Sequence, residues 1–215
     1  AAMRALGVSL VEHGSDFQAA REHAMALAQQ QGLHMVPSFH PDLIRGVMTY
    51  WVEFFESFAK GEAPDVVFVP IGQGSGFCAA AAARAHTGAR SKLVGVVSAH
   101  ATAYLASFKT GKLTEAAVTT VLADGMACRV PDAESLEVVL READDVVAVT
   151  DAEVAQAMRV LFADTHNVAE GAGAAALAAA MQQRDALQGK VVGVTLCGGN
   201  VDSEVFARVL AGADA

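Results

Sequence analysis

The chain has 215 residues, of which 53% are hydrophobic and 18% are charged, and its formal net charge is −9. This length suffices for one large or two small domains, and the acidic balance argues against a nucleic-acid partner or an anionic membrane surface. The three cysteines have no close pairing, which favours a reduced, cytoplasmic setting. The seven histidines lack zinc-ligand spacing, and no segment resembles a signal peptide or a membrane span.

The first 40 residues (1–40) predict part of a small β-α-β domain. Its predicted elements are a helix end at residues 1–7, a strand at Val8–Glu12, a helix that ends at Gly32 and a strand at His34–Phe39. Ser15 and Gln18 have the spacing of a capping box, with Ser15 as N-cap. Because the chain opens in the middle of a unit, we expect it to be a fragment of a longer protein. We place a domain boundary near residue 40.

Residues 41–215 predict a larger domain in which strands and helices alternate. Pro41 and Asp42 start a long helix, which Lys60–Gly61 ends. Thr150 and Glu153 form a second capping box, at the start of a helix to about residue 163. The other predicted elements are strands at 66–71, 92–98, 145–150 and 190–196, and helices at 77–87, about 101–110, near 133–142, 171–186 and 202–210.

The composition of the strands indicates the fold class. Val66–Ile71 and Val191–Leu196 are apolar on both faces, which is typical of central strands in a parallel sheet covered by helices. We therefore predict an α/β fold with an open, twisted, mostly parallel sheet and helices on both faces. Ligands of such sheets bind at the carboxyl ends of the strands, so the loops that follow strands are the candidate sites.

A glycine-rich loop follows the first strand of the larger domain and precedes an alanine-rich helix. Its residues are Gly72, Gln73, Gly74, Ser75 and Gly76. Glycines let backbone N–H groups approach a ligand closely, and the helix start adds unpaired donors and the positive end of a dipole. A phosphate group suits such a turn, although packing alone also accounts for a glycine-rich turn.

Two familiar phosphate-binding patterns are excluded at this loop. A P-loop requires Gly-Lys-Ser/Thr, which the sequence lacks. A dinucleotide fingerprint needs a glycine where Phe77 stands and an acidic residue after the next strand, which ends in Val97–Ser98. These departures argue against a dinucleotide oxidoreductase, and a phosphate monoester remains as the ligand.

Three further residues lie in loops between predicted elements. Cys197 lies in Leu196–Asn200 directly after the last strand, Glu170 lies in Asn167–Gly173, and Gly125 lies in a turn. Taken singly, they suit a buried core thiol, a solvated first-turn acid and an ordinary turn. The two glycines after Cys197 nevertheless leave room for a flat ring.

The motifs in their order resemble the C-terminal two-thirds of the serine/threonine dehydratases, which are fold-type II pyridoxal-phosphate enzymes related to tryptophan synthase β. The resemblance runs from Met3 to Leu210 and depends on the joint order of the motifs rather than on any single one. They are Arg4–Gly7, Val69–Ser75, Ala123–Ala127, Glu170–Ala175 and Leu196–Asn200.

The resemblance implies pyridoxal 5'-phosphate as cofactor and β-elimination as reaction. The loop 72–76 would hold the phosphate, Cys197 would face the pyridine nitrogen, Gly125 would lie along the ring and Glu170 near its polar edge. A neutral thiol cannot hold that nitrogen protonated, so the cofactor is a restrained electron sink that suits prompt loss of a β-hydroxyl. Such enzymes convert a small β-hydroxy amino acid, serine or threonine, into a 2-oxo acid and ammonia. The resemblance also favours a homodimer.

The sequence departs from the family in three respects. The family's Schiff-base lysine and its carboxylate-binding loop have no match, so the catalytic residue is unknown and we expect the chain alone to be inactive. Gln73 and Ser75 replace glycines, so the loop keeps its backbone donors only if both have negative φ. Val97 and Ala103 stand where metal-binding relatives have acids, so we expect no metal. The lysines without a matching context are Lys60, Lys92, Lys109, Lys112 and Lys190.

Several alternatives stay open at this point. Within the same family they are an amino-acid racemase and a lyase for a bulkier β-hydroxy amino acid. From other classes they are a dinucleotide oxidoreductase, which Phe77 and Val97 oppose, and a non-catalytic module that binds a phosphate ligand.

Overall fold

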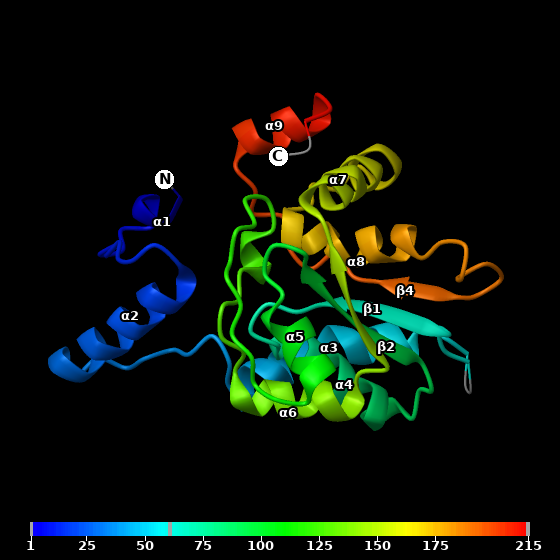
Figure 1. Cartoon of the computed structure of the whole chain (residues 1–215), viewed down its shortest axis with the longest axis horizontal. Coiled ribbons are helices and arrows are strands. Elements are labelled where there is room, and N and C mark those ends of the chain that lie inside the picture. Colours follow the sequence, from blue (N-terminus) through cyan, green and yellow to red (C-terminus); the bar gives the residue numbers. More distant parts are fainter. Residues whose placement is uncertain (1, 60–61, 214–215) are drawn as a thin grey trace. The chain divides into compact units, whose positions relative to one another are not determined.

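The computed structural model describes residues 2–59 and 62–213, and the chain divides into two compact units (Figure 1). One unit extends to Pro37 and the other begins at Ser38. This division lies close to the predicted boundary near residue 40, and the assignment of residues 1–40 to a separate domain stays a prediction. Within the described ranges, no helix is both long and apolar enough to cross a membrane.

The first unit contains two helices, α1 (Ala2–Ala5) and α2 (Phe17–Gln31). The predicted N-cap Ser15 is wrong by one position, because the side chain of Asp16 accepts the hydrogen bond from the N–H of Ala19 at 2.8 Å. Gln18 bonds along the helix surface instead of closing a capping box. Gly32 ends α2 in the left-handed conformation, as predicted.

The two strands predicted in this part of the chain are wrong. Neither Val8–Glu12 nor His34–Phe39 forms a strand in the described structure. Val8 is 51% exposed and Val36 is 69% exposed, so these segments do not bury the apolar side chains on which the prediction rested. A strand requires a hydrogen-bonded neighbour, and the described part of the chain supplies none to either segment.

The second unit is built on a parallel sheet with strand order β3-β2-β1-β4. The strands are β1 (Val66–Pro70), β2 (Lys92–Ser98), β3 (Asp145–Val149) and β4 (Val192–Val194). In this register Val66 pairs with both Lys92 and Val192, so β1, β2 and β4 start side by side at the same end of the sheet. The predicted α/β fold with a parallel sheet is therefore confirmed.

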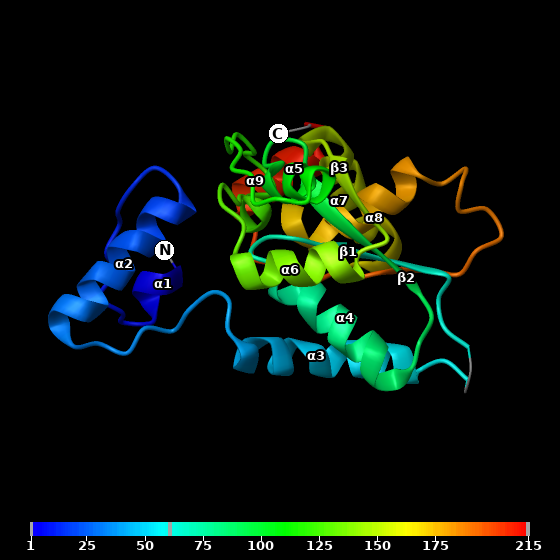
Figure 2. The same ribbon diagram turned by 60° about the horizontal axis from the view of Figure 1, so that its bottom comes forward.

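The helices of the second unit are α3 (Pro41–Glu56), α4 (Ser75–Thr87), α5 (Ala103–Thr110), α6 (Ala133–Glu142), α7 (Asp151–Thr165), α8 (Gly171–Gln182) and α9 (Ser203–Leu210). They cover both faces of the sheet, with α3 and α4 on one side and α7 and α8 on the other (Figure 2). Successive side chains of a strand point to opposite faces. Phe68 and Val96 accordingly pack with α7–α9, whereas Val67 and Val97 pack with α3–α6.

Most element boundaries follow the local signals. Pro41 lies at the start of α3, and the capping box of Thr150 and Glu153 is present at the start of α7. Two predicted ends are wrong, because α3 ends at Glu56 and α8 ends at Gln182. The predicted stop at positions 60 and 61 lies outside the described residues.

The prediction that Val191–Leu196 is a central strand is wrong. Its strand portion, β4, pairs with β1 and lies at an edge of the described sheet. Val191 is 53% exposed and Leu196 is 39% exposed. Apolar composition on both faces therefore marked a strand correctly but did not locate it within the sheet.

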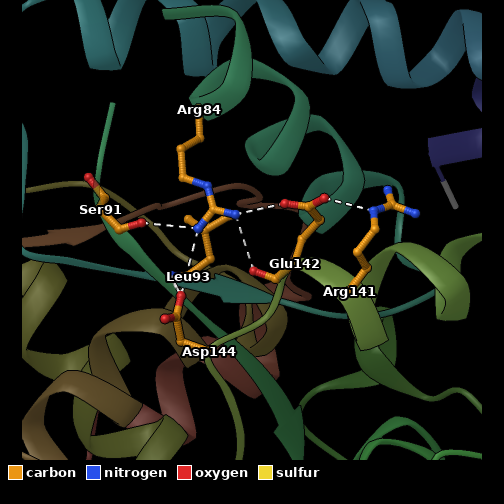
Figure 3. Close-up of polar contacts among 6 residues, drawn as sticks. All are labelled: Arg84, Ser91, Leu93, Arg141, Glu142 and Asp144. Atoms are coloured by element: carbon orange, nitrogen blue, oxygen red, sulfur yellow. Dashed lines mark hydrogen bonds and ion pairs between the residues drawn. The ribbon is translucent and has the colours of Figure 1, made fainter. Parts of the chain in front are cut away.

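A cluster of charged residues ties α4 to the connection between α6 and β3 (Figure 3). Arg84 in α4 donates to the backbone oxygen of Ser91 at 3.1 Å and to the carboxylate of Glu142 at 2.9 Å. It also lies 3.7 Å from the carboxylate of Asp144, which accepts a hydrogen bond from the N–H of Leu93. These contacts hold the start of β2 against the neighbouring helices.

Candidate functional site

The loops after β1 and β4 leave the sheet at the same edge. The two strands are parallel neighbours, with Phe68 paired to Val194. The glycine loop at 72–76 follows β1, and the segment 197–200 follows β4. Both predicted segments therefore lie at the carboxyl edge, where open parallel sheets bind their ligands.

The glycine loop ends in the first turn of α4. Gly74 is the N-cap residue, has φ +97° and receives no side-chain cap from the described chain. The first intrahelical bond runs from the N–H of Cys78 to the oxygen of Gly74 at 2.9 Å, so the three N–H groups before Cys78 precede the helical bonding. This cradle of backbone donors fits a phosphate group.

The substitutions in the loop do not disturb its backbone. Among the described non-glycine residues only His166 has positive φ. The φ angles of Gln73 and Ser75 are therefore in the range that residues with a Cβ adopt readily. The side-chain amide of Gln73 donates a hydrogen bond to Sγ of Cys128 at 3.3 Å. The loop therefore meets the condition under which its backbone donors are kept.

Gly125 lies against the glycine loop. It belongs to the 3₁₀ turn η1 (Asp124–Met126), and its carbonyl oxygen would collide with a Cβ added to Gly72. A Cβ added to Gly125 would in turn lie 2.9 Å from Cβ of Ala172, at the start of α8. The absence of side chains here lets the three backbone segments meet.

Glu170 joins this group to the loop after β4. Its N–H donates to the oxygen of Gly198 at 3.0 Å, and its carboxylate accepts a hydrogen bond from the N–H of Asn200 at 2.9 Å. A Cβ added to Gly125 would lie 3.6 Å from the same carboxylate. Glu170 thus lies between Gly125 and the loop that contains Cys197.

Cys197 lies beside Ala172 of α8, the residue that also lies against Gly125. Although the residue as a whole is exposed, its Sγ lies 4.0 Å from the carbonyl oxygen of Ala172. Burial, and secondly the charge of Glu170, raise the pKa of the Cys197 thiol. The sulfur therefore stays a neutral thiol at neutral pH.

Tyr50 lies near Cys197 and is hydrogen-bonded to Thr195, and the sequence reasoning missed both Tyr50 and Thr195. Burial raises the pKa of Tyr50 to about 12, opposed by a hydrogen bond with the side chain of Thr195 and reinforced by nearby Cys197. The phenol therefore stays protonated. Thr195 directly precedes the predicted motif, which was a signal for it, whereas Tyr50 lies far away in the sequence.

Tyr104 and Ser135 lie behind the glycine loop and were also missed. Both are buried, and their hydroxyl groups are hydrogen-bonded to each other. The hydroxyl of Tyr104 donates to the carbonyl oxygen of Gln73 at 2.9 Å. Their positions on α5 and α6 carry no local pattern that points to the loop.

The lysines with described positions are not gathered at this edge. Lys92 and Lys190 lie at the other end of the sheet, where β2 and β4 start. They line a cavity of about 1160 Å³, and none of the predicted site residues contributes to its lining. Val97 and Ala103 are buried apolar residues. Within the described ranges, no group of three His, Cys, Asp or Glu side chains could hold a metal ion.

Comparison with known proteins gives consistent relatives. The L-threonine ammonia-lyase of Thermotoga maritima is 31% identical over 208 residues, which are 96% of this chain and 51% of that enzyme. The L-threonine ammonia-lyase of Geobacter sulfurreducens is 33% identical over 213 residues, 97% of this chain and 52% of that enzyme. The chain thus spans about half the length of these curated relatives.

Solved structures and a family model agree with these relatives. The processed form of threonine deaminase isoform 2 from Solanum lycopersicum matches with a TM-score of 0.86 and 26% identity, covering 99% of this chain and 62% of that one. The model of the family described as "Pyridoxal-phosphate dependent enzyme" matches residues 1–198. The chain therefore belongs to the pyridoxal-phosphate-dependent enzyme family, with the fold-type II architecture of its serine/threonine dehydratases.

Proposed function

We propose that this chain forms the phosphate-binding and ring-facing part of an ammonia-lyase that removes water from a small β-hydroxy amino acid, threonine or serine. The observation that carries the proposal is the convergence of the glycine loop, Gly125, Glu170 and Cys197 at one edge of the sheet. Relatives of this chain are threonine ammonia-lyases, and the chain covers about half of their length.

Each part of the edge has a role in this proposal. The N–H groups before Cys78 bind the phosphate, while Gly72 and Gly125 leave a surface without side chains for a flat ring. Glu170 binds the loop after β4 through two hydrogen bonds, and Cys197 in that loop would face the ring nitrogen. When bound, pyridoxal 5'-phosphate supplies the electron sink for loss of the α-proton and the β-hydroxyl.

The thiol of Cys197 favours elimination in this scheme. A group with a raised pKa stays neutral and cannot hold a ring nitrogen protonated as a carboxylate does. Beside such a thiol, pyridoxal 5'-phosphate would be a restrained electron sink, which suits prompt loss of a β-hydroxyl.

A bulkier β-hydroxy amino acid is the second candidate substrate. A Pseudomonas enzyme named L-threo-3-hydroxyaspartate ammonia-lyase is 28% identical over 213 residues and covers 99% of this chain and 66% of that enzyme. A racemase with the same cofactor and a non-catalytic module for a phosphate ligand are the remaining outcomes of the test. We also propose a cytoplasmic homodimer, which size-exclusion chromatography with light scattering checks.

The test of the cofactor site uses the single tryptophan, Trp51, which is 1% exposed in the core. Its fluorescence is followed during titration with pyridoxal 5'-phosphate, pyridoxal and NADH. We expect saturable binding of pyridoxal 5'-phosphate, weaker binding of pyridoxal and none of NADH. Equal affinity for the first two ligands, or preference for NADH, overturns the assignment.

The reaction is tested on the protein isolated from its native source and loaded with pyridoxal 5'-phosphate. Threonine, serine and 3-hydroxyaspartate are supplied in turn, and ammonia and 2-oxo acid are quantified. Equal amounts of both products from threonine or serine support the proposal. Formation of the D-amino acid without ammonia identifies a racemase instead, and no turnover of any substrate supports a binding module.

A further inference from the structure

A buried tyrosine braces the glycine loop from the side of α5 and α6. The hydroxyl of Tyr104, whose side chain is 1% exposed, donates to the carbonyl oxygen of Gln73 at 2.9 Å. The hydroxyl oxygen of Tyr104 in turn accepts a hydrogen bond from the N–H of Asp132 at 3.2 Å. Because the Tyr104 proton is directed to Gln73, the neighbouring hydroxyl of Ser135 acts as the donor in their mutual contact.

This bond determines the orientation of the peptide group that joins Gln73 to Gly74. A trans peptide is planar, and its C=O and N–H groups point in opposite directions. The carbonyl oxygen of Gln73 faces Tyr104, so the N–H of Gly74 faces away from α5 and α6. That direction leaves the Gly74 N–H available to a ligand in the loop.

Packing reinforces the same arrangement. A Cβ added to Gly74 would lie 2.6 Å from Cβ of Ser135 and 3.2 Å from the hydroxyl oxygen of Tyr104, so the loop lies directly on this pair. Burial raises the pKa of Tyr104 well above its ordinary value. The phenol therefore keeps its proton, and remains a hydrogen-bond donor, at neutral pH.

We propose that Tyr104 is a positioning residue whose hydroxyl holds the Gln73–Gly74 peptide so that the N–H of Gly74 donates to the phosphate of the bound ligand. Tyr104 acts through the peptide and does not contact the ligand. This inference rests on the phosphate site of the proposed function.

The variant Tyr104→Phe removes the hydroxyl and keeps the ring. We expect the Kd for pyridoxal 5'-phosphate to rise about five- to tenfold, the loss that one well-placed hydrogen bond produces. The Kd for pyridoxal, which lacks the phosphate, stays unchanged. In proton–nitrogen NMR spectra, the shift of the Gly74 amide on addition of pyridoxal 5'-phosphate becomes smaller than in the wild type.

Ser107→Ala is the matched control. Ser107 also lies in α5 and is buried, and its hydroxyl accepts a hydrogen bond from the N–H of Thr114 at 2.9 Å, away from the glycine loop. Its removal deletes one buried hydroxyl from the same helix. We expect lower thermal stability in this variant, with both dissociation constants and the Gly74 shift unchanged.

The outcomes separate this inference from the function on which it rests. If the wild-type protein does not prefer pyridoxal 5'-phosphate to pyridoxal, the phosphate site and the role of Tyr104 both fall. If it does, and Tyr104→Phe keeps both dissociation constants, only the role of Tyr104 is wrong. Should Tyr104→Phe not fold, the wild-type spectrum decides, because an unshifted Gly74 amide at saturation contradicts the proposal.

Discussion

Gly74 is the residue on which the shape of the glycine loop most depends. Its φ of +97° is unfavourable for any residue with a Cβ, and that Cβ would press on Ser135. By contrast, Gly76 lacks positive φ, and a Cβ there would lie 3.8 Å from the oxygen of Pro70. Replacement of these two glycines of the same loop should therefore differ in its effect on the free energy of unfolding.

Gly74→Ala is expected to lower the free energy of unfolding by about 1–3 kcal/mol through backbone strain and overpacking. Gly76→Ala, within α4, changes it by less than about 1 kcal/mol in either direction. Urea denaturation of both variants measures the difference. A loss as large for Gly76→Ala as for Gly74→Ala contradicts the argument.

The reactivity of Cys197 is a second property set by single residues. Burial and the charge of Glu170 raise the pKa of its thiol, so its thiolate is scarcer than that of a free cysteine at a given pH. At pH 8 we expect iodoacetamide to alkylate Cys197 more slowly in the folded protein than in urea. The folded rate should still be rising above pH 9.

Peptide mapping separates Cys197 from the two buried cysteines, and Glu170→Gln provides the charge test. Removal of the neighbouring carboxylate lowers the thiol pKa, so this variant should react faster than the wild type at pH 8. A folded protein alkylated as fast as the unfolded chain shows that the raised pKa is wrong.

At the scale of elements, the charged cluster of Arg84 links α4, β2 and the connection between α6 and β3 (Figure 3). Arg84→Met removes these bonds and is expected to lower the free energy of unfolding by about 1–2 kcal/mol at pH 7. Arg45→Met is the control. Its ion pair with Asp42 joins side chains that are 77% and 72% exposed, so its loss should be under about 0.5 kcal/mol.

The effect of Arg84 depends on pH through Glu142. Hydrogen bonds from Arg141 and from Arg84 lower the pKa of Glu142. A lowered pKa contributes stability that is present above the unfolded pKa and is lost as the pH falls through the folded value. The difference between wild type and Arg84→Met should therefore shrink on acidification, and a constant difference from pH 7 to pH 3 would argue against the cluster.

At the scale of the whole molecule, both hydrophobic cores belong to the second unit. In the described chain, the residues of these cores and those packed against them all lie from Ile44 onward. A protein that begins at Ser38 is therefore expected to unfold cooperatively, with a free energy of unfolding within about 1 kcal/mol of the full chain. Circular dichroism during urea denaturation measures this, and a non-cooperative transition contradicts it.

Local signals were sufficient for most elements of the second unit, whereas the roles of the candidate site residues stay a prediction. The range Lys92–Ser98 and the capping box at Thr150 were predicted correctly, because each depends on neighbouring residues. The strands predicted around α2 were wrong, because strand formation depends on a distant partner that the described chain does not supply. Tyr104 could not be found, since only the packing of α5 and α6 places its hydroxyl at Gln73.

The sequence by itself determined the fold class, the family resemblance and the loops of the candidate cofactor site, because motifs and apolar periodicity are properties of consecutive residues. Only the tertiary structure decided that these loops meet and that β4 lies at the edge of the described sheet. It alone places Glu170 between Gly125 and the loop of Cys197. The physical reason is that strand order and contacts between distant residues follow from the packing of the complete sheet, which no short segment specifies.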